Sequence, residues 1–153
     1  MRTVTVRLNG NNQIAVTVGD ESRTGECYYL GLHPNSIGSD FNPRRGVELL
    51  LGQWLRLLTD LRDEEQLFLP FDFSDEFTRW LTVRRSGCDA TIVIGWSTIE
   101  GWAISLEDFS DLAHGLPGFI PDDPLTPQTF YLPRVLSDLR SCVMNLHCRS
   151  EST

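Results

Sequence analysis

The sequence predicts an α+β fold: a single domain whose antiparallel sheet, an N-terminal hairpin plus a later meander, packs against a long helix and a C-terminal helix. Two observations predict it. Strand-like alternation and helix-like spacing of apolar residues fall in separate blocks, unlike the regular alternation of a parallel α/β fold. The 153 residues, 41% of them hydrophobic, also suit one domain with one core. We expect this domain at residues 1–148, followed by a mobile polar tail at 149–153.

The N-terminal block predicts a β-hairpin and a third strand. Apolar residues alternate over residues 3–8 and 14–18, and the turn between them contains Asn-Gly, which favours the positive φ angles of a tight turn. A third strand is expected at 26–32, where Tyr28, Leu30 and Leu32 would share one face. The segment 33–42, rich in Pro, Asn, Ser and Gly, is expected to be a loop.

The middle of the chain predicts a long helix followed by a four-stranded meander. The helix is expected at 43–62, because Asn42 can cap it, Pro43 suits its first turn, and the apolar residues have helical spacing. The strands are expected at 67–73, 79–85, 91–97 and 102–104. Pro70 cannot donate a ladder hydrogen bond, so the first of these strands should lie at a sheet edge or contain a bulge.

The C-terminal block predicts two helices separated by a proline-rich loop. A short helix is expected from Ser105 to Gly115, where the glycine would end it. The irregular segment 116–127 follows, and the last helix is expected to begin near Pro133 or one turn earlier.

The charge composition restricts the possible functions. All thirteen basic residues are arginines, so mechanisms that need a Schiff-base lysine or a P-loop lysine are excluded. The net charge of −8 repels nucleic acids and anionic membranes and attracts basic proteins, so we expect a basic protein partner and neither nucleic acid nor membrane. The N-terminus lacks the pattern of a signal peptide, and no apolar run has membrane-spanning length, which predicts a cytoplasmic protein.

Patterns for catalysis are weak. A Cys27–His33 nucleophile pair would need the chain to bend back, and the acids Asp72, Asp75 and Glu76 crowd one turn, where acids commonly form local hydrogen bonds. A small hydrolase or transferase that uses either set therefore remains the alternative hypothesis. We expect no cofactor and no metal site, because the cysteine and histidine spacings match no common zinc motif.

Acids and tryptophans point to a surface for a protein partner. Seven acidic residues lie between Asp60 and Glu76, against one arginine. Two Gly-Trp pairs flank a hairpin loop expected at 98–101, which would place one indole in the core and the other on the far face beside the acids. The predicted partner-binding residues are Asp72, Asp75, Glu76, Trp96, Glu100 and Trp102.

These observations favour a protein-binding module without enzymatic activity. A small, acidic α+β domain of this kind has the properties of an immunity protein or antitoxin, which would occlude a basic partner with the acidic turn and the aromatic hairpin. An accessory subunit or a homo-oligomeric scaffold is a further alternative, and the sequence leaves the oligomeric state open.

Overall fold

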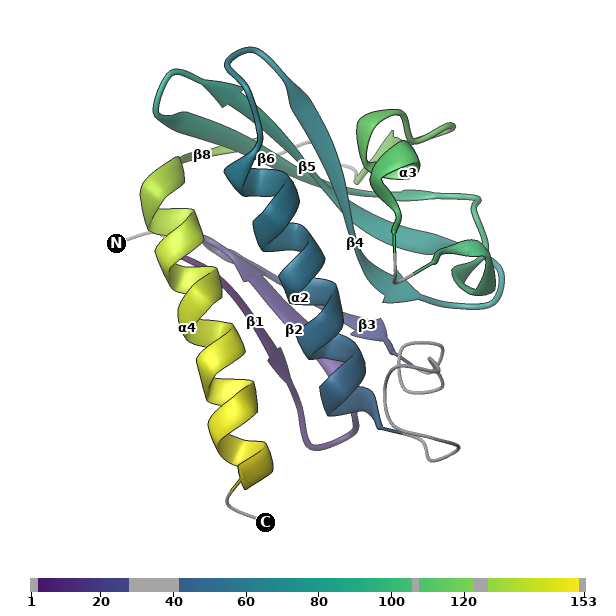
Figure 1. Ribbon diagram of the computed structural model, residues 1–153. Coiled ribbons are helices and arrows are strands. Elements are labelled where there is room, and N and C mark those ends of the chain that lie inside the picture. The colour runs from purple at the N-terminus through teal and green to yellow at the C-terminus, as the bar shows by residue number, and fades with distance from the viewer. Residues whose placement is uncertain (1–2, 28–41, 106–107, 123–126, 152–153) are drawn as a thin grey trace.

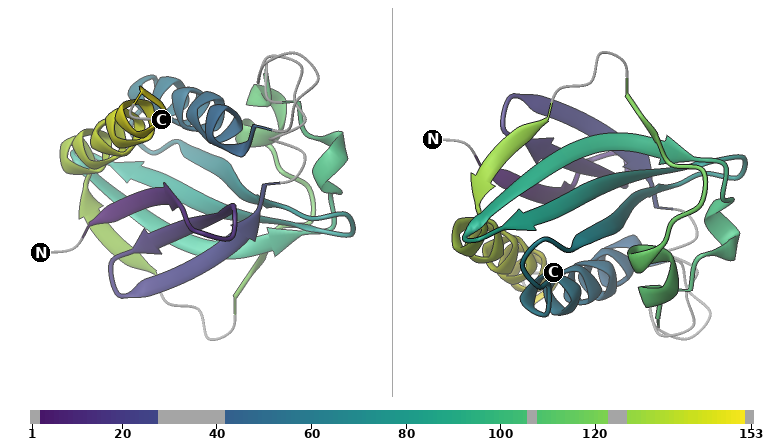
Figure 2. Two further views of the ribbon diagram at one scale, coloured as in Figure 1. Left: turned by 90° about the horizontal axis from the view of Figure 1, so that it is seen from below. Right: turned by 90° about the horizontal axis from the view of Figure 1, so that it is seen from above.

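Two antiparallel sheets and a pair of long helices form the protein in the computed structural model, which describes residues 3–27, 42–105, 108–122 and 127–151. The helices α2 (Pro43–Thr59) and α4 (Leu132–Glu151) lie side by side (Figure 1). In the left view of Figure 2, the three-stranded sheet crosses in front of the five-stranded sheet, and both helices lie on one side. The α+β class expected from the sequence is confirmed.

The three-stranded sheet has the order β1-β2-β3. The expected hairpin joins β1 (Val4–Leu8) to β2 (Gln13–Val18), and Asn12 in its turn has a φ of 58°. The third strand of the sheet begins earlier than expected: β3 spans Glu21–Glu26, mostly in a segment where the sequence predicts no strand. The register with β2 selects this polar segment, whereas residues 28–32 lie outside the described part of the chain.

The five-stranded sheet begins with a meander that the sequence predicts closely. The strands are β4 (Gln66–Phe73), β5 (Thr78–Ser86) and β6 (Asp89–Ser97), all antiparallel. β4 lies at one end of the strand order, and its register with β5 shifts between Pro70 and Asp72. Both expectations for the proline-containing strand, an edge position and a bulge, are therefore confirmed.

The fourth meander strand expected at 102–104 is a wrong prediction. Gly101–Ala103 forms a 3₁₀ turn, η2, instead of a strand that returns along β6. Two short strands pair with the free edge of β6: β7 (Ile120–Pro121) at one end and β8 (Gln128–Tyr131) at the other. Between β6 and β7 lies the short helix α3 (Ser110–His114).

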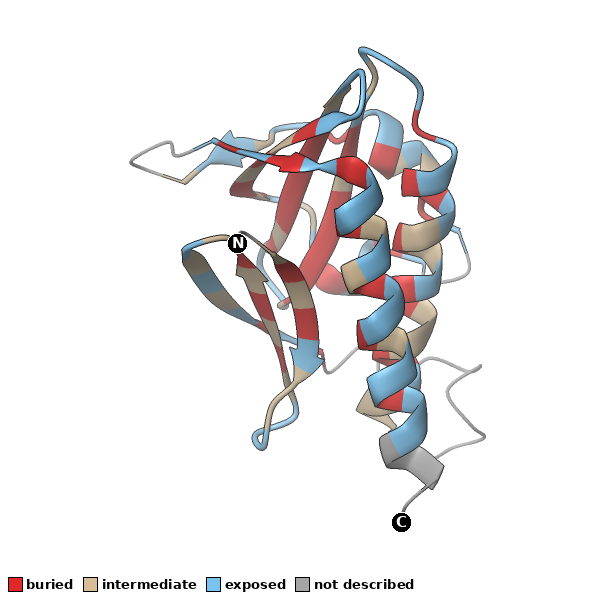
Figure 3. Cartoon of the chain, turned by 90° about the vertical axis from the view of Figure 1, so that its left-hand side faces the viewer, coloured by how far each residue is buried: buried red, intermediate tan, exposed pale blue. Residues whose placement is uncertain are grey.

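One apolar core joins the sheets to the helices. Figure 3 shows that the buried residues lie on the facing sides of strands and helices. Trp54 of α2 is fully buried, and its indole N–H donates a hydrogen bond to the Pro70 carbonyl at 3.1 Å. Full burial of a side chain this large makes α2 a principal source of stability. None of the helices in the described ranges has the length and apolar character needed to cross a lipid bilayer.

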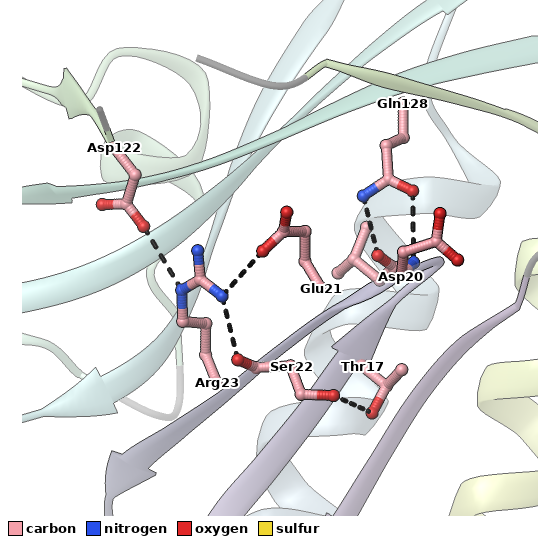
Figure 4. Close-up of polar contacts among 8 residues, drawn as sticks. Thr17, Asp20, Glu21, Ser22, Arg23, Asp122 and Gln128 are labelled. Carbon is pink, nitrogen blue, oxygen red and sulfur yellow. Dashed lines mark hydrogen bonds and ion pairs between the residues drawn. The ribbon is translucent and has the colours of Figure 1, made fainter. Parts of the chain in front are cut away.

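Polar contacts hold the β2–β3 hairpin against the five-stranded sheet (Figure 4). The Gln128 amide donates to the Val18 carbonyl at 2.8 Å. Arg23 of β3 forms an ion pair with Asp122, just after β7, at 3.4 Å. These contacts fix one sheet relative to the other and thereby shape the surface between them.

Candidate partner-binding site

Two turns meet at one end of the five-stranded sheet. The turn between β4 and β5 contains Ser74, whose carbonyl accepts a hydrogen bond from the Gly101 N–H at 2.8 Å. The Thr78 hydroxyl donates to the Ile99 carbonyl at 2.9 Å. A Cβ at position 101 would lie 2.5–2.7 Å from backbone atoms of Phe73 and Ser74, so only glycine allows this close approach. Segments that the sequence places far apart are thus held side by side.

The exposed side chains of these turns combine acids and aromatic rings. We call them the turn patch, which consists of Asp75, Glu76, Phe77, Glu100 and Trp102. The side chain of Trp102 is 62% exposed and that of Phe77 is 36% exposed. The indole N–H of Trp102 donates to the Glu100 carboxylate, which orients the ring on the surface. Exposed aromatic rings beside carboxylates suit the docking of a protein that carries basic groups.

Trp96 extends the turn patch along β6. It is half-buried, and its ring meets that of Phe77 edge-to-face with centroids 6.4 Å apart. Its register partner on β7 is Ile120, which is 45% exposed. The expectation that one indole of this pair is buried is wrong, because η2 replaces the hairpin; the fully buried tryptophans are Trp54 and Trp80.

Asp72 differs from the other acids of the predicted set because it is only 6% exposed. Its Oδ1 accepts hydrogen bonds from the Glu26 N–H at 2.9 Å and from the Ser74 hydroxyl at 2.8 Å. Its Oδ2 lies 3.8 Å from the Arg79 guanidinium. Loss of water around the carboxylate outweighs these partners and raises the pKa of Asp72 above its ordinary value. The buried Asp72 carboxylate therefore links the end of β3 to the β4–β5 turn that carries part of the turn patch.

This environment predicts a pH effect on stability. Because the pKa of Asp72 is raised in the folded state, this state binds the Asp72 proton more tightly than the unfolded state does. The bound proton therefore contributes stability below the ordinary carboxyl pKa, and this contribution is lost as the pH rises through the raised value. The variant Asp72→Asn keeps an acceptor for the Glu26 N–H but cannot ionise. Its stability relative to the unmodified protein is therefore expected to increase with pH, as measured by urea unfolding from weakly acidic to neutral conditions.

Asp72→Ala provides a comparison for Asp72→Asn in the same measurement. Asp72→Ala removes the acceptor and is expected to cost about 1–3 kcal/mol throughout, because a buried N–H loses its partner. A difference between Asp72→Asn and the unmodified protein that stays constant with pH would contradict the assigned burial.

The candidate thiol of the alternative enzyme hypothesis is held in a protonated state. Cys27 is buried and donates to the Asn12 carbonyl at 2.6 Å. Burial, with a smaller contribution from Glu26, raises the pKa of Cys27 to about 11. A nucleophilic thiol needs the opposite shift. His33, the other member of the pair, lies outside the described residues.

A groove of about 580 Å³ continues from the turn patch onto the three-stranded sheet. Phe77 and Asp72 line its side toward β4 and β5, and three arginines from different strands also line it: Arg7, Arg23 and Arg79. A basic groove beside an acidic patch is a feature that the sequence analysis did not predict.

The structure brings the predicted acids and tryptophans to one end of the sheet. Asp72 is buried there and Trp96 is half-buried, whereas the other predicted residues are exposed. The sequence analysis missed Phe77 and the groove arginines. A signal for Phe77 was present: it is a large apolar residue directly after the acidic turn 74–76, where a solvated turn would not need one.

Protein-family models and curated proteins give no match to this sequence. Among solved structures, the fold is similar to that of a chain in the "CdiA-CT/CdiI toxin and immunity complex from Enterobacter cloacae". The TM-score is 0.54, with 12% sequence identity over 95% of this chain and 99% of that chain. At this identity the similarity concerns the fold alone.

Proposed function

We propose that the protein is an immunity-type binding module, which neutralises a protein partner by covering a basic surface of it. The observation that carries the proposal is the turn patch, where exposed aromatic rings stand among carboxylates on two interlocked turns. The net charge of −8 and the fold shared with a chain of a toxin and immunity complex support it.

The geometry suggests how each part of the patch would act. Asp75, Glu76 and Glu100 would attract a basic partner from a distance and orient its approach. Phe77 and Trp102 would then lose their contact with water and slow dissociation. Because the Gly101 N–H is bonded to the neighbouring turn, the patch would be ordered before binding, which reduces the entropic cost of association.

The function is tested with the protein encoded by the gene adjacent to that of this chain. Cells that express this neighbour alone should stop growing, and co-expression of the chain should restore growth. The two purified proteins should also elute together in size-exclusion chromatography. A harmless neighbour, or a toxic one whose effect persists with the chain present and which does not bind it, would refute the proposal.

Charge reversal tests the electrostatic part. The double variant Asp75→Lys with Glu76→Lys is expected to slow association about tenfold at low salt, and less at high salt, because it removes the local attraction. Stopped-flow measurement of the association rate at several salt concentrations checks this result.

A matched control changes the same charge elsewhere. Asp60 and Asp89 are exposed near the opposite end of the sheet, where the Glu64 N–H donates to the Arg85 carbonyl. Asp60→Lys with Asp89→Lys should slow association distinctly less. Equal slowing by both double variants would show that only the total charge matters and not the turn patch.

A further inference from the structure

The three arginines that line the groove beside the turn patch differ in how many hydrogen bonds and ion pairs their guanidinium groups make. Arg23 already has two acidic partners, because its guanidinium lies 3.0 Å from Glu21 and 3.4 Å from Asp122, and it also lies 2.9 Å from the Ser22 carbonyl. These two acids compensate the charge of Arg23, so this arginine links strands and attracts an anionic ligand less than an unpaired arginine would.

The guanidinium groups of Arg7 and Arg79 have fewer partners than that of Arg23. Arg7 is exposed, and its guanidinium makes no hydrogen bond or ion pair with any residue in the described ranges. Arg79 has one ion pair there, to Asp72 at 3.8 Å, which exceeds the length of a charge-assisted hydrogen bond. The two groove-lining guanidinium groups therefore retain donors whose planar fork matches a carboxylate.

The floor of the groove has room for an incoming group. It consists of small side chains on the outer face of the three-stranded sheet, where Ala15 and Thr24 face the same side as Arg7. The hydroxyls of Thr17 and Ser22 lie 3.3 Å apart in the same groove and can donate further hydrogen bonds.

We propose that this groove binds a carboxylate-bearing segment of the protein partner, so that acidic and basic contacts stand side by side in one interface. The inference rests on the proposed function, because it assigns a second charge contact to the same partner. A carboxylate is favoured over a polyanion because Asp72 lines the groove, the turn patch adjoins it, and the net charge of −8 repels a phosphate backbone. A single carboxylate carries too little charge for that repulsion to prevail over bidentate contact.

The sign of one charge reversal tests the inference. Long-range attraction alone predicts that Arg7→Glu, which makes the protein more acidic, binds a basic partner more tightly. A carboxylate contact predicts the reverse: the dissociation constant should rise about tenfold or more, mainly through faster dissociation. The matched control is Arg140→Glu, since Arg140 is exposed on α4 and its guanidinium likewise makes no hydrogen bond or ion pair within the described residues. Unchanged or tighter binding by Arg7→Glu would overturn the inference.

A partner-free measurement separates this inference from the proposed function. The side-chain Nε–H signals of the arginines are followed by NMR during titration with a short peptide that carries a single glutamate between capped, uncharged ends, and with a thymidine octamer. The peptide is expected to shift the Arg7 and Arg79 signals but not that of Arg140, and Arg7→Glu should weaken this binding about tenfold.

Each other result has a defined meaning. No shift with either probe, or shifts at lower concentration with the oligonucleotide than with the peptide, would overturn the inference; the second result would assign the groove to nucleic acid. If the neighbouring gene product fails to bind the unmodified protein, the proposed function fails and the peptide titration alone decides the inference.

Discussion

Replacing Trp102 with alanine is expected to weaken partner binding about a hundredfold, or roughly 3 kcal/mol. The indole is 62% exposed, and its N–H is held by Glu100, so it presents a large oriented surface for burial. The fold should not suffer, because Gly101, not the indole, makes the hydrogen bond to Ser74. Isothermal titration calorimetry with the partner measures the affinity, and circular dichroism confirms that the variant is folded.

Tyr131 provides a matched control for an exposed aromatic side chain. It is 58% exposed in β8, which pairs with the end of β6 that lies away from the turn patch. Tyr131→Ala should leave the affinity within about twofold, as surface positions outside an interface do. If Tyr131→Ala weakened binding as much as Trp102→Ala, the interface would have to lie elsewhere or cover both ends of the sheet.

Gly25→Ala is expected to lower the free energy of unfolding by about 3 kcal/mol. A Cβ at this position of β3 would lie 2.3 Å from the Phe71 carbonyl oxygen and 2.8 Å from the Asp72 Cα. Backbone atoms of β4 cannot move aside as a flexible side chain would, so the two strands must separate. That separation also breaks the hydrogen bond from the Glu26 N–H to Asp72, and urea unfolding measures the total.

Gly52→Ala makes the matched comparison. Gly52 is exposed within α2, and a Cβ there meets no atom within 4 Å. Alanine restricts the unfolded chain and favours a helix, so this variant should gain about 1 kcal/mol. Opposite signs for the same chemical change would locate the cost at the β3–β4 contact. Equal tolerance of both variants would contradict the close approach of these strands.

Local patterns predicted the elements whose residues interact with near neighbours in the sequence. The first hairpin, the helix that begins at Pro43 and the bulged strand around Pro70 all occur as expected, although the positive φ of the hairpin turn lies at Asn12 and not at the Asn-Gly pair. In each case a local residue preference restricts the backbone directly: Asn12 adopts positive φ, Asn42 caps the helix, and Pro70 lacks an N–H.

The wrong predictions involve pairings between distant residues. β7 and β8 are short and contain proline or polar residues, and only their register with β6 makes them strands. The segment after Trp102 carries apolar residues that resemble a strand, yet the close contact of Gly101 with the β4–β5 turn directs the chain away from the sheet. The candidate site was found in part, because acids and tryptophans are visible in the sequence. The groove was not found, since only the tertiary structure brings Arg7 and Arg79 to line the same groove.

The first strands of the chain are held in place by β8 and α4, and this has a consequence for biosynthesis. The Val6 N–H donates to the Cys142 sulfur and the Gln128 amide to Val18, across 136 and 110 residues of sequence respectively. While the ribosome is still translating α4, the N-terminal hairpins of the nascent chain lack the surface that covers their apolar side. The domain consequently cannot reach its native state until α4 has been synthesised, and chaperones that shield exposed hairpins would matter most for this protein before that point.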